Sequence, residues 1–141
     1  MTEIDSILGR LLRTAGASRV TLRQDLPGDY AFPVTNEALA AGVPSLLDER
    51  TVELRNQPVV RELMCGHQVV QADCRAAFDE PAFYRMLETY GGLAAQVVTP
   101  IIVGERLAAI LSLHQLGMPR SWTDAEVAAC TVTADRVAQL L

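Results

Sequence analysis

A strand near the middle of the chain carries small and polar side chains in a pattern that could hold a ligand. Residues 94–115 are rich in Val, Ile, Thr and Leu and are interrupted at Gly104, which indicates two strands joined by a tight turn. If residues 102 and 107 pair across that turn, alternation places smaller or polar residues on one face: Ala108, Ile110, Ser112 and His114. The other face carries Leu107, Ala109, Leu111, Leu113 and Gln115. We therefore expect a pocket on the smaller face.

His114 lies near the end of this strand, where its imidazole can exchange a hydrogen bond with a ligand or titrate near neutral pH. The alternative is a histidine that the adjoining loop satisfies. Ser112 would supply a hydroxyl group on the same face. Gln96 is a further candidate, although the predicted pairing puts it opposite Leu113 and away from His114 unless a bulge shifts the register.

A helix with large apolar side chains is predicted to cover that face. Asp79 can cap it, Pro81 fits its first turn and Gly91-Gly92 can end it. Its stripe, at helical spacing, comprises Phe83, Met86, Leu87 and Tyr90. The stripe is typical of a hydrophobic core, but it could also enclose a ligand, since Tyr90 can bury its ring while its hydroxyl contacts the ligand. We expect a small, partly apolar ligand between this helix and the strand face of His114.

Two arginines are candidates for binding an anionic group of a ligand. Arg23 lies in the strand-like segment 18–24, whose alternation predicts one wet face, and Arg75 follows the strand-like segment 68–73. A guanidinium at a pocket mouth can bind a carboxylate through two hydrogen bonds, although most arginines simply face water. The whole chain has a net charge of −5, with twelve arginines and no lysine. This acidic balance predicts no binding of nucleic acid.

The three cysteines are Cys65, Cys74 and Cys130. An odd count without an export signal favours reduced thiols, and their spacing lacks the paired pattern of zinc sites. We expect no metal and no disulfide, and we expect the cysteines to be small buried hydrophobes. Only His67 and His114 could serve a Ser-His-Asp triad, and neither has a nucleophile motif nearby.

The 141 residues predict one domain over residues 1–141. Apolar runs are too short to span a membrane and the N-terminus is acidic, so we expect a cytoplasmic location without membrane contact. The predicted elements are a helix from Asp5 or Ser6 to Gly16, a hairpin of residues 18–24 and 30–34, a helix from Pro58 to Gly66, a strand in 68–73, the helix ending at Tyr90, the hairpin 94–115 and a last helix from Thr123 to Leu141. Residues 36–50 show no clear period.

The last helix has a wider apolar face than one sheet can cover. Thr123 and Glu126 form a capping box at its start, and apolar residues then spread around the cylinder as far as Leu141. Together with Ile4, Leu8 and Leu11, this surface predicts a homodimer built on the first and last helices.

The order of elements resembles a GAF domain over essentially the whole chain. The residues that carry the resemblance are Thr99-Pro100-Ile101, the strand from Leu107 to Gln115 that ends in His114-Gln115, and the run Pro119-Arg120-Ser121-Trp122 leading to Glu126. They are most similar to GAF domains of phytochromes and cyanobacteriochromes. The resemblance implies an α/β (α+β) fold, with an antiparallel sheet of five or six strands, terminal helices on one face and a ligand pocket on the other. It also implies that residues 66–76 and 83–90 roof the pocket, and that His114 matches a chromophore-contacting histidine.

Two departures from that family's patterns narrow the choice of ligand. Residues 75–100 contain no cysteine, so we do not expect a covalently attached bilin. The Asn-Lys-x-Phe-Asp-Glu set of cyclic-nucleotide GAF domains and a phosphate-binding glycine loop are both missing from the sequence. The identity of the cofactor or ligand therefore stays open.

Three functions are compatible with these patterns. The first is a small-molecule-sensing, regulatory GAF domain that acts on a separate signalling protein, because the chain has no room for an output domain. The second is a thiol-dependent enzyme resembling the free methionine-R-sulfoxide reductases, although the cysteine spacing differs from theirs. The third is an unliganded interaction module whose pocket is filled by Phe83, Met86 and Tyr90.

Overall fold

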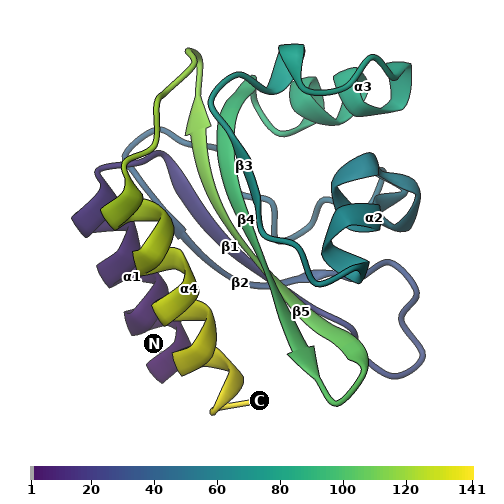
Figure 1. Cartoon of the computed structure of the whole chain (residues 1–141), viewed down its shortest axis with the longest axis vertical. Coiled ribbons are helices and arrows are strands. Elements are labelled where there is room, and N and C mark those ends of the chain that lie inside the picture. Colours follow the sequence, from purple (N-terminus) through teal and green to yellow (C-terminus); the bar gives the residue numbers. More distant parts are fainter. Residues whose placement is uncertain (1) are drawn as a thin grey trace.

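A five-stranded antiparallel sheet separates two layers of helices in the computed structural model, which describes residues 2–141 (Figure 1). The spatial order is β2 (Val34–Leu39), β1 (Arg19–Gln24), β5 (Arg106–Leu116), β4 (Leu93–Val103) and β3 (Val69–Gln71). Helices α1 (Glu3–Ala15) and α4 (Asp124–Ala138) cover one face, and α2 (Pro58–Met64) and α3 (Pro81–Thr89) lie over the other (Figure 1). Short 3-10 turns η1 (Leu54–Asn56) and η2 (Cys74–Ala76) complete the fold. The predicted fold class is confirmed.

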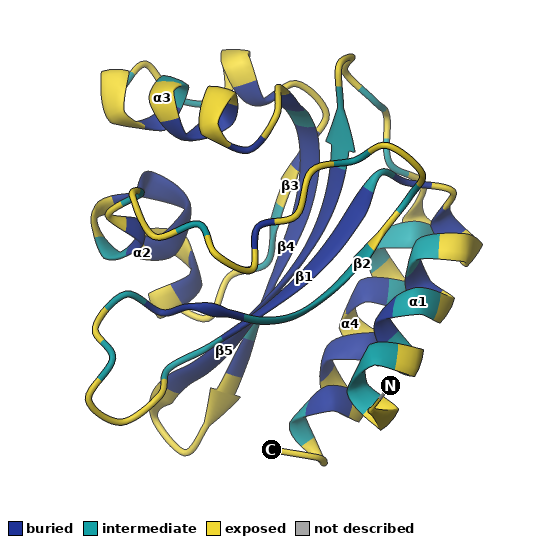
Figure 2. Ribbon diagram, turned by 180° about the vertical axis from the view of Figure 1, so that it is seen from behind, coloured by how far each residue is buried: buried dark blue, intermediate teal, exposed yellow. Residues whose placement is uncertain are grey.

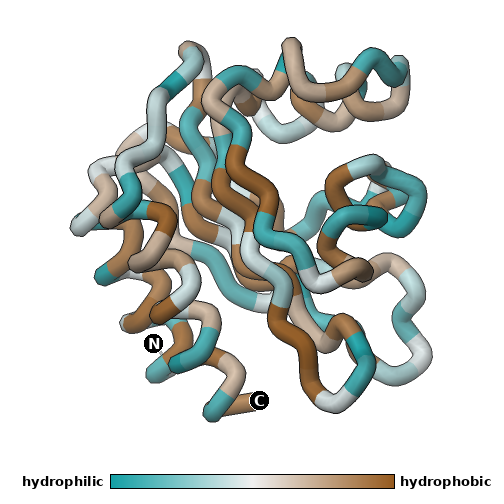
Figure 3. Tube along the Cα trace, in the orientation of Figure 1, coloured by the Kyte–Doolittle hydropathy of each residue, from teal (hydrophilic) through white to brown (hydrophobic). Residues whose placement is uncertain are grey.

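The sheet has a hydrophobic cluster on each side, so its central strands are buried on both faces (Figure 2). The cluster between the sheet and helices α1 and α4, which we call the helix-side cluster, includes Leu8, Leu11, Val20, Leu111, Leu113 and Val137. The cluster between the sheet and helices α2 and α3, which we call the roof-side cluster, includes Leu54, Val60, Leu63, Phe83, Leu87 and Ile110. Figure 3 shows brown, hydrophobic stretches along the central strands. Leu8 and Leu11, counted above toward a dimer surface, are buried within the chain itself.

A bulge at Ala108 changes the register of the β4–β5 hairpin. Ile102 pairs with Leu107 as predicted, but Ile101 pairs with Ala109, so Ala108 is the extra residue on β5. Beyond the bulge, Gln96 faces His114 instead of Leu113, and the predicted placement of Gln96 on the opposite face is wrong. The bulge also moves Leu107 into the roof-side cluster, away from Leu111 and Leu113.

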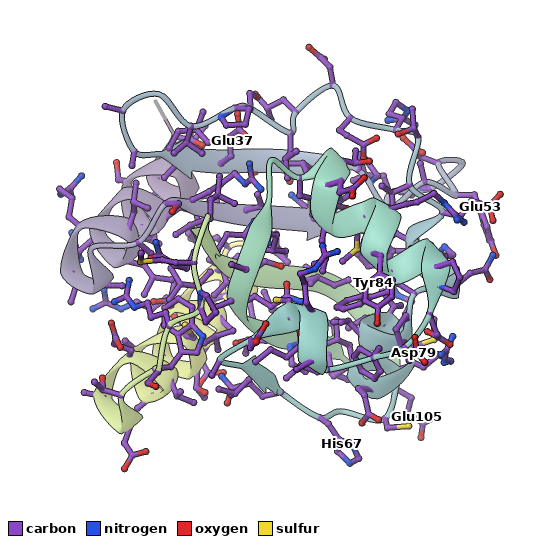
Figure 4. All side chains as sticks on the ribbon, turned by 90° about the horizontal axis from the view of Figure 1, so that it is seen from above. Glu37, Glu53, His67, Asp79, Tyr84 and Glu105 are labelled. Carbon is purple, nitrogen blue, oxygen red and sulfur yellow. The ribbon has the colours of Figure 1, made fainter. Side chains whose placement is uncertain are left out.

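Several element boundaries differ from the predictions because other residues make the caps. Thr2 caps α1 and forms a capping box with Asp5, which was itself predicted as the cap. Glu80, rather than Asp79, precedes α3, and the Asp79 carboxylate accepts a hydrogen bond from Tyr84 Oη at 3.3 Å (Figure 4). The predicted hairpin arm 30–34 begins instead at Val34. The capping box of Thr123 and Glu126 is confirmed.

Arg120 connects the two terminal helices to the sheet. Its guanidinium donates to the Gly16 carbonyl at the end of α1, to Gln115 Oε1 at 3.1 Å, and to the Glu126 carboxylate at the start of α4. It also lies over the ring of Trp122, at 4.6 Å from Cζ to the ring centroid. The indole nitrogen of Trp122 donates in turn to the Gln71 carbonyl of β3 at 3.1 Å. Within the described residues, no helix is both long and apolar enough to cross a membrane.

Candidate ligand-binding site

A row of polar side chains crosses four strands on the roof side of the sheet. The pairing register aligns Arg19 of β1 with His114 of β5, Gln96 of β4 and Gln71 of β3. All four are buried, and Arg19 has no exposed surface. Since side chains alternate along a strand, Thr21 and Arg23 share the face of Arg19 while Val20 and Leu22 enter the helix-side core. The segment read as having one wet face therefore has both faces covered.

Arg19 fixes the orientation of His114. Its Nε–H donates to His114 Nδ1 at 3.1 Å, and its two terminal nitrogens donate to the carbonyl oxygens of Pro44 at 2.9 Å and Tyr90 at 2.7 Å. Burial, with the positive charges of Arg19 and Arg23, lowers the pKa of His114 well below its usual value. The imidazole is therefore neutral at neutral pH. Because Nδ1 is the acceptor, its proton lies on Nε2, which is a hydrogen-bond donor.

Arg23 makes a second buried connection between sheet and roof. It donates to the Phe32 carbonyl at 3.0 Å and to Tyr90 Oη at 2.7 Å. The Tyr90 ring stacks on His114 with centroids 6.0 Å apart, and burial raises the pKa of Tyr90. Phe32 adopts φ = 56°, a strained conformation for a bulky residue, while presenting its carbonyl to this arginine.

A cavity of about 30 Å³ lies between this strand face and the roof formed by α2, α3 and residues 46–57. Its apolar walls are Leu46, Leu54, Val59, Val60, Leu63, Met86, Val98 and Ile110. Its polar lining is Thr21, Arg23, Gln57, Tyr90, Gln96, Ser112 and His114. The volume suffices for a water molecule or two. Gln57 Oε1 is buried with no hydrogen-bond partner, although Gln57 Nε2 reaches the Ala82 carbonyl at 3.4 Å.

The structure brings most of the predicted site residues together around this cavity: Arg23, Met86, Tyr90, Gln96, Ser112 and His114. Whether they bind a ligand stays a prediction. Phe83 does not line the cavity and packs edge-on against Phe78, at 5.2 Å between centroids. Arg75 is exposed and lies over the Tyr84 ring, so the structure contradicts its placement at the pocket.

The roof also differs from the prediction. Residues 66–76 are absent from the cavity lining, and α2 with the segment before it takes their place. The site has four further polar neighbours that were not predicted from the sequence: Arg19, Thr21, Gln57 and Gln71. The signal for Arg19 and Thr21 was the two-residue period that places them in phase with Arg23.

The remaining candidates for chemistry are dispersed. Cys65 is exposed, so its prediction as a buried residue is wrong, whereas Cys74 lies in the roof-side cluster and Cys130 lies in the helix-side cluster. Burial raises the pKa of both Cys74 and Cys130 to about 12, which disfavours their reactive thiolates. His67 lies at the periphery and pairs with Glu62 at 3.1 Å (Figure 4). Residues 2–141 contain no group of three His, Cys, Asp or Glu side chains that could hold a metal ion.

Comparison with known proteins places this architecture in one family. The sequence model of the GAF domain matches residues 2–141. A phycocyanobilin-bound GAF domain of a cyanobacterial phytochrome has 20% identity and a TM-score of 0.80, covering 97% of this chain and 81% of that one. The blue-light-absorbing PixJ GAF domain of Thermosynechococcus elongatus has 19% identity and a TM-score of 0.79, with 97% and 81% covered.

The chromophore-binding domain of a bacteriophytochrome from R. palustris has 18% identity and a TM-score of 0.79, covering 97% of this chain and 52% of that one. At these identities the likeness establishes the fold. No curated protein matches the chain significantly.

Proposed function

This chain belongs to the GAF domain family, and on that premise we propose that it is a sensory domain that binds a small molecule in the cavity beside His114. Binding there would regulate a separate partner. The observation that carries the proposal is the buried row of polar side chains along a cavity. Burying Arg19, Arg23 and a neutral histidine costs free energy that apolar residues would not, and stability alone gives no reason to retain them.

A bilin, which the similar phytochrome domain binds, does not fit the residues of this site. The cavity of about 30 Å³ is far smaller than the several hundred Å³ of an ordinary ligand pocket. None of the three cysteines lines it. The proposal therefore involves a smaller ligand held by hydrogen bonds and apolar contacts.

The hydrogen bonds of Gln71 support a route from the cavity to the terminal helices. Its side-chain oxygen accepts from Gln96 Nε2 at 2.9 Å, and its backbone carbonyl accepts from Trp122, just before α4. If ligand binding moves Gln96, these hydrogen bonds would transmit the displacement through Gln71 and Trp122 to the start of α4. We propose that α1 and α4 form the surface of a homodimer and transmit this change to the partner.

The test is a thermal-shift screen of small metabolites on the wild type and on Ser112→Leu, which fills the cavity. The matched control is Ser121→Leu, the same substitution at an exposed loop position. We expect a compound that raises the Tm of the wild type and of Ser121→Leu but not that of Ser112→Leu. Shifts of equal size in all three proteins would refute binding in the cavity.

An unliganded interaction module is the second candidate, favoured by the small volume of the cavity. A native mass spectrum of protein purified from its source separates the two functions. A co-purifying small molecule that disappears in Ser112→Leu supports the sensory domain. A thiol-dependent enzyme has less support, since Cys74 and Cys130 lie on opposite faces of the sheet and cannot form a thiol relay.

A further inference from the structure

We infer that the ligand of this cavity is a small 2-hydroxy carboxylate. The inference rests on the proposed function and specifies its ligand by charge, by hydrogen-bonding groups and by size. Each of these properties follows from a different feature of the cavity lining.

The charge follows from two buried guanidinium groups without a paired carboxylate. The partners of Arg23 are the Phe32 carbonyl and the Tyr90 hydroxyl, and those of Arg19 are His114 and two backbone carbonyls. No Asp or Glu lines the cavity. The Glu37 carboxylate, whose charge acts on Arg19, accepts hydrogen bonds from Ser45 and from the Leu46 N–H instead. A bound carboxylate would compensate the positive charge that Arg23 brings to the cavity.

The lining can also donate to such a group from several directions. His114 Nε2–H is a donor because Nδ1 accepts from Arg19. Ser112 and Thr21 pair with one another across β5 and β1, and each brings a hydroxyl group to the cavity. These donors and Arg23 lie on adjacent strands of one sheet face, so the carboxylate is expected against the sheet.

The requirement for a hydroxyl group follows from Gln57, a residue of the roof. Gln57 precedes α2 and is 3% exposed, and its Oε1 has no partner. A buried acceptor without a donor destabilises the fold, because the water that it loses on burial is not replaced. A ligand with an O–H group beside its carboxylate would satisfy Gln57 Oε1 on the roof while its carboxylate contacts the sheet.

The size follows from the cavity volume of about 30 Å³ and from walls of Leu, Val, Ile and Met side chains. The cavity as it stands admits a water molecule or two, so the proposed ligand is limited to a few heavy atoms with a short apolar substituent, and its binding requires that the roof moves outward. Glycolate and lactate represent this class.

The test measures binding of glycolate and lactate by calorimetry and compares it with acetate and propionate, which lack the hydroxyl group, and with propane-1,2-diol, which lacks the carboxylate. We expect the hydroxy acids to bind roughly tenfold or more tightly than the simple acids, and the diol not to bind. Gln57→Leu should abolish the difference between lactate and propionate while both still bind. Arg23→Gln should abolish binding of all the acids.

Arg75→Gln, an exposed arginine on the same side of the sheet, is the matched control and should bind lactate like the wild type. Circular dichroism establishes that each variant is folded; if Arg23→Gln unfolds, the Gln57→Leu comparison decides. Equal affinity for lactate and propionate in the wild type, or no binding of any acid, would overturn the inference. If an apolar or cationic compound instead binds in a Ser112-dependent way, the inference fails and the proposed function stands. If nothing binds in the cavity, both fail.

Discussion

At the scale of single residues, the site is dominated by cations that are buried without acidic partners. Burial lowers the pKa of Arg19 to about 10, and its guanidinium is held by a histidine and two carbonyl groups. Tyr90 joins both arginines: its carbonyl accepts from Arg19 and its hydroxyl accepts from Arg23. Each partner therefore matters more than an ordinary surface hydrogen bond would.

Tyr90→Phe removes only the hydroxyl group that Arg23 contacts. A buried hydrogen bond to a charged donor is worth about 1.5–3 kcal/mol, so we expect the free energy of unfolding to fall by about that amount. Urea denaturation measures it, and Tyr84→Phe, whose hydroxyl is on the surface, is the control. A loss no larger than that of the control would mean that Arg23 finds another partner.

The neutral state of His114 predicts a pH dependence of stability. The folded-state pKa lies below the unfolded value of about 6.5, so the unfolded chain binds a proton more readily. His114 makes its full contribution to the free energy of unfolding above about pH 6.5. The free energy of unfolding therefore falls as the pH drops from about 7 toward 5. The groups that face it are Arg19, Arg23 and Tyr90.

His114→Gln cannot take up this proton but keeps an acceptor for Arg19, so it should show a shallower loss of stability between pH 7 and 5. Denaturation curves across this range test the expectation. His67→Gln, at an exposed histidine, should keep the wild-type slope. A wild-type slope in His114→Gln would show that other groups carry the dependence.

At the scale of elements, Arg120 links the end of α1 to the start of α4. It satisfies a carbonyl that the terminating α1 leaves free, and it pairs with the capping-box residue Glu126. The side chain of Arg120 is 22% exposed, so solvent screens the pair only partly.

Arg120→Gln should destabilise the fold by about 1–3 kcal/mol, since several hydrogen bonds and the contact with Trp122 are lost together. Arg136→Gln, at an exposed arginine of α4, should change the free energy of unfolding little. Chemical denaturation of both variants measures the difference. Equal effects in both variants would show that the contacts of Arg120 contribute no more to stability than a surface charge does.

At the scale of the whole molecule, the sheet separates the thiols into three environments. Iodoacetamide should modify Cys65 alone in the native protein, because Cys74 and Cys130 are buried and their thiolates are disfavoured. An intact mass with one added group, and with three after denaturation, is the expected result. Rapid native labelling of a second cysteine would indicate that one side of the sheet opens.

The proposed homodimer relies on exposed apolar side chains of α4 and the C-terminus, since Leu8 and Leu11 pack inside the chain. Val132 is 57% exposed and Leu140 is 42% exposed. Val132→Glu should shift the sedimentation of a dimer toward the monomer, whereas Met118→Glu, in an exposed loop, should not. A wild type that sediments as a monomer at micromolar concentration would contradict the proposal.

The sequence by itself determined the features whose causes lie within a few residues of one another. The capping box of Thr123 and Glu126, the turn at Gly104 and the proline at the start of α2 all follow from local hydrogen-bonding and backbone preferences. The two-residue period of β5 placed Ser112 and His114 on the cavity side, and the stripe of α3 placed Met86 and Tyr90 above them.

Only the tertiary structure decided which residues meet across the sheet and what covers them. The bulge at Ala108 brought Gln96 opposite His114, and no local signal marks that extra residue. The alternation of β1 implies that Arg19 and Arg23 share a face, but a strand pattern does not reveal whether water or a roof lies over that face. Gln57 joined the site because α2 folds over the sheet, a contact between segments far apart in the chain.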